Sequence, residues 1–348
     1  WLGTNITPSF KGNLTRKNPL FCNSTIKTRI FSPSNQVNKD IRFFTTKVKQ
    51  NGTQNFKLNP WFLTGFIDAE GCFMLNFVRN NKLKVGWRIQ PWFRIGLHKK
   101  DLYILQSIQN YLGVGKIYDQ GPEAIQYSVG SIKDLIIIEN HLNKYPLITK
   151  KNSDFLMFKK GLEIIKSNGH LTQEGLEKLV SIKASLNLGL SKKLEVAFPN
   201  VIPVNKEFND QKISDPNWLA GFMSGESCFY IKIYPSKTKS GEAVMLQFQL
   251  AQHIRDESLI RSISAYLHCG RITVLTDSVH LQVTKFSDLI DKVIPFFLEH
   301  PIQGIKSQDF KDFCLAAEIM KEKRHLTIEG LNHIREIKGR MNTGRIFT

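Results

Sequence analysis

Two glutamates at matched places, Glu70 and Glu226, are the residues of this chain best placed to do chemistry. Glu70 ends the run Leu-Thr-Gly-Phe-Ile-Asp-Ala-Glu, and Glu226 ends the run Leu-Ala-Gly-Phe-Met-Ser-Gly-Glu. If the fold brings these carboxylates together, they raise each other's pKa unless cations lie between them. A divalent metal resolves that repulsion and activates a water molecule for hydrolysis. A single acid at a helix end is ordinarily a solvated surface group, so the repetition favours the chemical role.

Each acid lies where a helix is expected to pass into a strand. Residues 60–70 begin with a proline, which suits the first turn of a helix, and Leu63 and Ile67 recur at helical spacing. Small residues lie between the apolar ones, including Gly65 and, in the second run, Gly221. We expect these glycines to let another backbone come close.

A stretch of about 130 residues occurs twice in the chain, at an offset of 155 or 156 residues. Lys151 matches Lys306, and His-Leu-Thr-Gln-Glu-Gly-Leu at 170–176 matches His-Leu-Thr-Ile-Glu-Gly-Leu at 325–331. Two copies make a tandem duplication and not a solenoid, which needs about three repeats or more. With 348 residues, each copy can bury a core of its own.

The coarse pattern of each copy is helix–strand–strand–helix–strand–strand–helix. The predicted strands are 72–79, 86–97, 116–120 and 125–129, then 228–234, 243–252, 271–275 and 279–283. The predicted helices after the opening one are 100–112 and 132–143, then 256–267 and 286–300, with Gly113 and Gly270 ending the first of each pair. The fold class is therefore α+β, an αββαββα unit twice, with two antiparallel sheets.

Composition divides the chain into four segments. Residues 1–57 form a basic, Ser/Thr/Asn-rich leader that we expect to be disordered, either a mitochondrial transit peptide or a remnant of a longer reading frame. Domain 1 covers 58–189, a linker with two prolines covers 190–214, and domain 2 covers 215–348.

The net charge of +18 points to a polyanionic partner. An anionic membrane surface is the other polyanion, but the sequence has no apolar run near the length of a spanning helix. Five cysteines without a CxxC pair argue against both a disulfide framework and a zinc knuckle. We therefore expect a reduced, intracellular and soluble protein.

The second predicted strand of the first copy alternates apolar and polar residues. Its odd positions are mostly apolar, whereas its even positions include Arg88, Gln90, Trp92 and Arg94. A polar face of one strand is usually just solvated, but here it is rich in Arg, Lys, Gln and Asn and occurs twice. A two-stranded ribbon of this kind fits the DNA major groove, where Arg reads guanine and Gln or Asn reads adenine.

The runs 63–71 and 219–227 resemble the two motifs of a single-chain LAGLIDADG homing endonuclease of the organelle intron-encoded type. The resemblance covers the chain from about residue 58 onward. It also includes the paired blocks 93–101 with 248–256 and 145–151 with 300–306, and the block 182–190. It implies a monomer with pseudo-two-fold symmetry, in which the two sheets form a DNA-binding saddle and the motif helices meet at Gly65 and Gly221.

The resemblance implies that Glu70 and Glu226 are metal ligands, together with the backbone of Ala69 and Gly225. Oxygen-only ligands suit Mg²⁺, which keeps several waters. We expect Mn²⁺ to substitute and Ca²⁺ to bind without supporting cleavage. By the same pattern, Lys151, Lys306 and Gln252 complete the catalytic set: the lysines near the cut phosphates, the glutamine positioning solvent.

The two copies differ at this centre. Leu97 stands where the second copy has Gln252, and Ser227 replaces the glycine after the acid, with a backbone conformation that glycine takes more readily. Either difference could slow one strand's cut. Asp68 and its counterpart Ser224 are expected to be capping and packing residues.

The outward positions of both sheets are the predicted DNA-binding residues. In domain 1 they are Asn76, Asn80, Lys82, Arg88, Gln90, Arg94, Tyr118, Gln120, Gln126 and Ser128. In domain 2 they are Lys232, Tyr234, Ser236, Gln247, Gln249, Thr273, His280 and Gln282. Because the two sets differ, the preferred site should be non-palindromic, and affinity should fall steeply with salt.

These observations and the resemblance predict a sequence-specific, metal-dependent DNA endonuclease that cuts both strands of double-stranded DNA. The resemblance further implies that the cut leaves short 3′ overhangs. The alternative on the same scaffold is a maturase that binds intron RNA, and both activities could coexist. A basic ribosome-associated protein would explain the charge but not the matched acids. By analogy with the family, the compartment is a mitochondrion, of a fungus.

Overall fold

The computed structural model describes residues 58–206 and 212–345. The leader predicted over residues 1–57 lies outside the described residues. No helix in the described part of the chain is long and apolar enough to cross a membrane.

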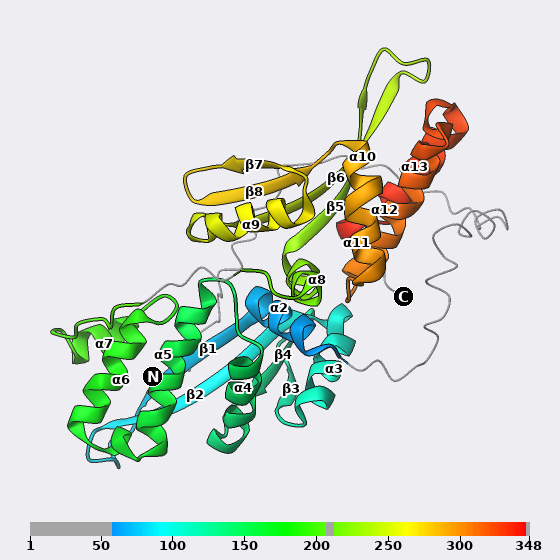
Figure 1. Cartoon of the computed structure of the whole chain (residues 1–348). Helices are drawn as coiled ribbons and strands as arrows, with labels where there is room; N and C mark the ends of the chain where they lie inside the picture. The colour runs from blue at the N-terminus through cyan, green and yellow to red at the C-terminus, as the bar shows by residue number, and fades with distance from the viewer. Residues whose placement is uncertain (1–57, 207–211, 346–348) are drawn as a thin grey trace, which may run out of the picture. The chain divides into compact units, whose positions relative to one another are not determined.

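The first copy follows the predicted order of elements (Figure 1). It begins with α2 (Pro60–Glu70), β1 (Gly71–Arg79), β2 (Trp87–His98), η1 (Lys99–Asp101) and α3 (Leu102–Leu112). It continues with β3 (Lys116–Asp119), β4 (Ala124–Val129), α4 (Ile132–Lys144), α5 (Lys151–Lys166) and α6 (Gln173–Ser185).

The second copy repeats these elements. They are α8 (Pro216–Glu226), β5 (Ser227–Pro235), β6 (Glu242–His253), η3 (Ile254–Asp256), α9 (Glu257–Leu267), β7 (Arg271–Val274) and β8 (Ser278–Val283), then α10 (Phe286–Asp288), η4 (Leu289–Val293), α11 (Ile294–Glu299), α12 (Lys306–Lys321) and α13 (Ile328–Gly339). The strand orders β1-β2-β4-β3 and β5-β6-β8-β7 match, and every pairing is antiparallel. The predicted α+β class with two antiparallel sheets is confirmed.

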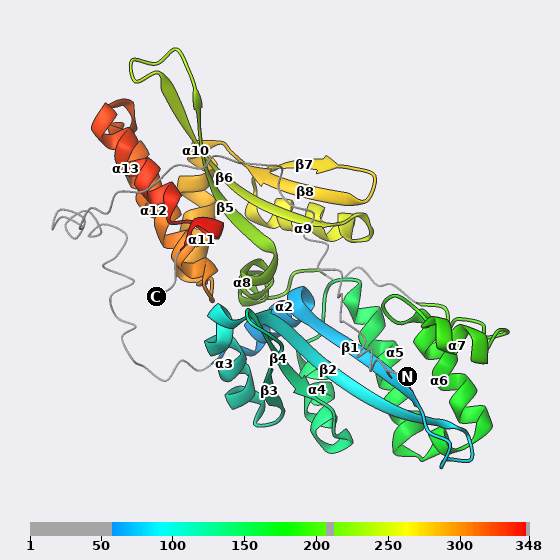
Figure 2. The same ribbon diagram turned by 180° about the vertical axis from the view of Figure 1, so that it is seen from behind.

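The two opening helices, α2 and α8, pack directly against each other (Figures 1 and 2). A Cβ added to Gly65 would lie 1.9 Å from the Trp218 carbonyl oxygen, and one added to Gly221 would lie 2.0 Å from the Phe62 carbonyl oxygen. No real side chain fits at such distances from backbone atoms, so both glycines are required by the contact. Both helices end at this interface in a glutamate.

Matched aromatic clusters bind each sheet to its helices. Phe73 on β1 lies 5.4 Å from the Phe155 ring and 5.5 Å from the Phe158 ring, both on α5. Its counterpart Phe229 lies 5.3 Å from Phe310 and 5.2 Å from Phe313 on α12. Helices α5 and α12 are thus held to β1 and β5, the strands that follow α2 and α8. This packing brings the first residues of α5 and α12 to the C-terminal ends of α2 and α8.

Three details differ from the predicted pattern. Helix α9 is capped by His268, which takes the left-handed conformation (φ 51°), and not by Gly270 two residues later. The helix predicted over 286–300 contains a π turn, Leu289–Val293, ahead of Pro295, which has no N–H to donate to the preceding turn. The segment predicted as linker contains a short helix, α7 (Lys192–Ala197).

Candidate active site

The two glutamates meet at the ends of the motif helices. A Cβ added to Gly225, the residue before Glu226, would lie 3.2 Å from Glu70 Oε1 and 2.4 Å from the Ala69 Cβ. Burial raises the pKa of Glu226, and the Glu70 charge raises this pKa further. Lys151, Lys306 and a hydrogen bond from Gln252 act in the opposite direction. The acids thus share one partly neutralised, half-buried centre.

The two lysines bind the same helix ends. Lys151 Nζ donates to the carbonyl oxygens of Ile67 and Ala69, both at 3.1 Å. Lys306 Nζ donates to the carbonyls of Met223 at 3.3 Å and Gly225 at 2.7 Å. The last carbonyls of a helix lack intrahelical partners and carry its negative dipole end, so an ammonium is favoured there. Each lysine is the first residue of its own helix, α5 or α12.

The donors around the acids fit a hard divalent cation. The set consists of two carboxylates and the carbonyls of Ala69 and Gly225, each of which keeps a second lone pair beside its lysine bond. Among residues 58–206 and 212–345, no group of three or more His, Cys, Asp or Glu side chains is placed to hold a metal ion. A cation between Glu70 and Glu226 would therefore complete its ligands with water or phosphate oxygens.

The centre is asymmetric at its edges. Gln252, at the end of β6, forms a hydrogen bond to Glu226, whereas its counterpart Leu97 packs against the apolar core. The expected backbone difference at Ser227 is wrong: its φ of −83° is ordinary, as is the −72° of Gly71. What distinguishes Gly71 is space, because a Cβ there would lie 2.7 Å from Ile67 atoms. Ser227 Oγ donates to the Met223 carbonyl at 2.6 Å, an acceptor it shares with Lys306.

Asp68 and Ser224 cap the loops that lead into α5 and α12, as expected. The buried Asp68 carboxylate accepts hydrogen bonds from the backbone of Ile148 (2.8 Å), from the Thr149 hydroxyl (2.7 Å) and from the Trp218 indole (2.8 Å). Burial raises the pKa of Asp68 to about 6, although these hydrogen bonds lower it. Ser224 Oγ accepts a single bond of this kind, from the Gln303 backbone at 3.1 Å.

Most predicted DNA-binding residues lie on the outer faces of the two sheets or in their turns with at least part of the side chain accessible. Two do not. Ser128 is 5% exposed, because its short side chain lies in register between Arg94 and Lys116, and it donates to Gln126 Oε1. Gln247 is 3% exposed and donates to Gln249 Oε1 at 2.7 Å. Both can orient a neighbour but are too buried to reach a base.

The outer faces also hold residues that the sequence lists missed. The Arg94 guanidinium lies over the Trp92 ring, and the distance from its Cζ atom to the centre of the ring is 4.9 Å. Lys116 and Arg271 occupy matched positions opposite Ser128 and Gln282. The two-residue period that identified the other outward positions also applies to them, so the pattern could have found them.

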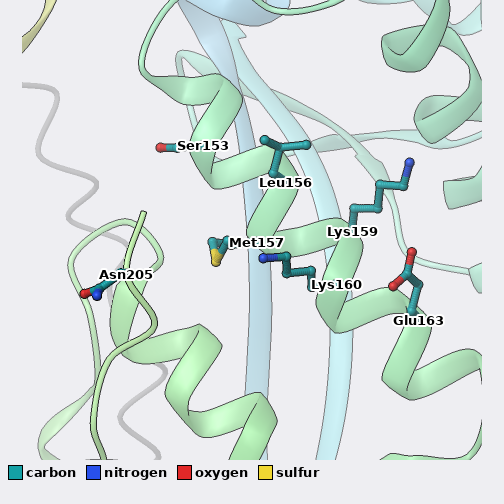
Figure 3. Close-up of a pocket in the computed structure, with 7 residues that line it drawn as sticks. All are labelled: Ser153, Leu156, Met157, Lys159, Lys160, Glu163 and Asn205. Carbon is teal, nitrogen blue, oxygen red and sulfur yellow. The ribbon is translucent and has the colours of Figure 1, made fainter. Parts of the chain in front are cut away.

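A hollow of about 350 Å³ is lined mainly by α5. Six of its lining residues, Ser153, Leu156, Met157, Lys159, Lys160 and Glu163, come from α5, and Asn205 faces them (Figure 3). It contains none of the predicted catalytic or DNA-binding residues, and we assign it no role.

Comparison with known proteins agrees with this geometry. The family model described as LAGLIDADG endonuclease matches twice, at residues 63–162 and 219–317. The chain is 38% identical over 290 residues to the probable intron-encoded endonuclease 3 of Neurospora crassa and 40% identical over 299 residues to the probable intron-encoded endonuclease 2 of that fungus. These alignments cover 82% and 81% of this chain but only 54% and 64% of those relatives.

Solved structures show the same fold. The LAGLIDADG meganuclease I-CpaMI bound to uncleaved DNA is 47% identical, with a TM-score of 0.80 over 82% of this chain and 100% of that one. The I-SmaMI homing endonuclease bound to cleaved DNA is 45% identical, with a TM-score of 0.82 over 84% of this chain and 100% of that one. With both motifs matched over more than half of its length, the chain belongs to the LAGLIDADG endonuclease family.

Proposed function

We propose that this chain is a sequence-specific homing endonuclease that cuts both strands of a long, non-palindromic DNA site and leaves short 3′ overhangs. The observation that carries the proposal is the shared centre at the C-terminal ends of α2 and α8. There Glu70 and Glu226 come together, and Lys151 and Lys306 bind the carbonyls of the same helix ends. The names of the relatives and the DNA-bound state of the similar structures support the same function.

Glu70 and Glu226 would hold divalent cations, Mg²⁺ in the cell, with the carbonyls of Ala69 and Gly225 as further oxygen ligands. Bound there, such a cation supplies Lewis-acid stabilisation and an activated water. Mn²⁺ would substitute, and Ca²⁺ would bind without supporting cleavage. The structure of I-SmaMI with uncleaved DNA in the presence of calcium ions supports this last point.

Lys151, Lys306 and Gln252 would act around the acids. An ammonium fixed at the foot of each motif helix offsets the charge that develops on a phosphate in the transition state. Since these ammonium groups are already held by backbone carbonyls, little reorganisation is needed when DNA arrives. Gln252, hydrogen-bonded to Glu226, orients that carboxylate and the solvent beside it.

The outer faces of the two sheets would bind double-stranded DNA. Long donors such as Arg88, Gln90 and Arg94 in the first sheet have different counterparts in the second, where Gln249 contacts His280 at 3.2 Å. Unequal faces read unequal half-sites, so the target is non-palindromic. A monomer with pseudo-two-fold symmetry suffices, since both motif helices belong to one chain.

We place the protein in a fungal mitochondrion, as the product of an intron. Relatives are named as intron-encoded proteins of fungi, and one is described as a protein in ND4 intron 1 of Podospora anserina.

Cleavage of a plasmid that carries the uninterrupted host-gene junction, with Mg²⁺ or Ca²⁺, tests the proposal. We expect double-strand cutting with Mg²⁺ and binding alone with Ca²⁺. If no junction is cut with Mg²⁺ while the intron RNA is bound tightly, the maturase function replaces the endonuclease.

A further inference from the structure

The N-cap residues of the two helices that carry the lysines make no side-chain cap bond. The N-cap residues of α5 and α12 are Lys150 and Ile305. Neither a lysine nor an isoleucine side chain has an acceptor atom, so neither can bond the backbone N–H groups that a helix start leaves unpaired. In the first copy, Thr149 Oγ1 accepts the N–H of the next residue after the N-cap, Lys151, at 3.1 Å.

The backbone N–H groups of these two N-cap residues are bonded by the other copy of the repeat. Asp256 Oδ1, of the second copy, accepts the backbone N–H of Lys150 at 2.9 Å. Asp101 Oδ1, of the first copy, accepts the backbone N–H of Ile305 at 2.7 Å. The two aspartates are matched residues at the ends of η1 and η3. The exchange is therefore reciprocal, with each copy capping the helix of the other.

The residues around these two aspartates show that the two copies of the repeat approach each other closely there. Gly304 takes a φ of +79°, and a Cβ there would lie 2.6 Å from Asp101 Oδ1. The Tyr103 hydroxyl accepts the Gly304 N–H and strengthens this crossing. At the other crossing Asp256 is 4% exposed, and Thr149, the counterpart of Gly304, is fixed by Asp68 of its own copy.

Each capped N–H lies one residue before an active-site lysine. Lys151 follows Lys150, and Lys306 follows Ile305, so the cap sets where the first turn of the helix begins and where the ammonium is anchored. We propose that Asp256 and Asp101 are positioning residues that act across the repeat: Asp256 positions Lys151, and Asp101 positions Lys306. This inference rests on the proposed role of the lysines in cutting.

Strand-specific cleavage tests the assignment. Single-turnover rates for each strand of a labelled target duplex would be measured with Mg²⁺ for Asp256→Ala, Asp101→Ala, Lys151→Ala and Lys306→Ala. Asp256→Ala should slow the same strand as Lys151→Ala, and Asp101→Ala the same strand as Lys306→Ala. Loss of one cap should slow that strand about fivefold to tenfold. Glu257→Ala, which removes a surface pair with Arg261 inside α9, is the matched control and should change neither strand.

Asparagine variants separate capping from general damage. Asparagine caps helices about as well as aspartate, so Asp256→Asn and Asp101→Asn should keep rates within about threefold of the unchanged protein. DNA affinity with Ca²⁺ should stay the same in all four aspartate variants. The inference is overturned if Asp256→Ala follows Lys306→Ala, if it slows both strands equally, or if asparagine is as harmful as alanine.

Amide hydrogen exchange gives a readout that does not depend on cutting. Asp256→Ala should speed exchange at residues 150–154 and not at 305–309, and Asp101→Ala the reverse. Uniform change in both segments would contradict the cross-repeat caps. If exchange shifts as expected but both lysine variants cut at full rate, the caps stand. The proposed role of the lysines, and the positioning role with it, would then be overturned.

Discussion

The two copies of the repeat keep the same order of strands and the same packing of helices but satisfy their buried polar groups in different ways. In the first copy, Thr64 Oγ1 contacts His141 Nε2 at 3.1 Å and donates to the Tyr145 carbonyl at 2.9 Å. The matched residues of the second copy are Ala220 and Phe296, both apolar. Ala220 is buried in the core of the first copy, and Phe296 is half-buried against the core of the second. The hydroxyl group and the imidazole that contact each other in the first copy are thus both replaced by apolar groups in the second.

The interface between α2 and α8 shows the same rule. Asp68 accepts the indole N–H of Trp218 from the other copy, while the symmetry-related pair is Ser224 and Phe62. A buried carboxylate needs several donors, whereas a serine facing a phenylalanine needs none from it. Around the acids, by contrast, both copies keep the glutamate and the lysine that bonds the carbonyls of its helix end, and they differ only at the edge of the centre. The charged residues at the proposed phosphate site are thus the same in both copies. In the core that supports them, residues that contact each other differ between the copies in pairs.

Adding one methyl group at the crossing of the motif helices should have the largest effect on both copies. Gly65→Ala or Gly221→Ala forces a Cβ to within 2.0 Å or less of a backbone carbonyl, which neither helix can avoid without separating. We expect a loss of about 3 kcal/mol in the free energy of unfolding, measured by urea denaturation.

Gly339→Ala is the matched control, because the described residues leave open space around a Cβ there at the end of α13. If Gly65→Ala is as stable as Gly339→Ala, the close crossing is wrong.

The buried histidine should make the first copy sensitive to acid. Burial lowers the pKa of His141 from 6.5 to about 4, so between these pH values the unfolded chain takes up a proton that the folded chain does not. Stability contributed by the neutral histidine is therefore present above pH 6.5 and lost as the pH falls toward 4, by about 3 kcal/mol in total.

His141→Phe, which copies Phe296, should reduce this loss. Urea denaturation at pH 7 and pH 5 would measure the difference. An equal loss of stability in both proteins on acidification would contradict the assignment.

The Asp68–Trp218 pair should show coupling that its counterpart lacks. Trp218→Phe removes one donor from a buried carboxylate and should cost about 2 kcal/mol. Asp68→Ser together with Trp218→Phe, which copies Ser224 and Phe62, should cost less than the sum of the single changes, by about 1 kcal/mol. A double-mutant cycle in urea measures this coupling, and strict additivity would show that the bond contributes nothing specific.

The smallest expected effect concerns the edge of the active centre. Gln252→Leu gives the second copy the residue of the first and removes a hydrogen bond to Glu226. We expect it to change the ratio of the two strand-cutting rates by about tenfold. The mirror variant Leu97→Gln should shift the ratio in the opposite direction. A ratio that neither change moves would mean that Gln252 does not create the asymmetry.

Local patterns in the sequence predicted the parts of this molecule that depend on neighbouring residues. Helical spacing around Leu63 and Ile67 and strand alternation in β2 placed the elements. The repeat paired the two acids and the two lysines, and the family resemblance implied that they share one centre. The glycines at 65 and 221 were expected to let another backbone come close, and the resemblance placed that approach between the two motif helices.

Such local patterns could not predict the contacts between the two copies. Asp101 and Ile305 are 204 residues apart, and Trp218 and Asp68 are 150 apart, so only the folded arrangement shows that they bond. The burial of Ser128 and Gln247 likewise depends on neighbours in adjacent strands and not on the two-residue period.

The most direct test of the central claim is cutting by Glu70→Gln and Glu226→Gln on a target selected from a randomised site library. Glutamine keeps the size of the side chain but removes the charge that a metal needs. With Mg²⁺, each variant should cut at least about a thousandfold more slowly than the unchanged protein, while DNA binding with Ca²⁺ stays intact. Full cutting by either variant would remove that acid from the active centre and contradict the account.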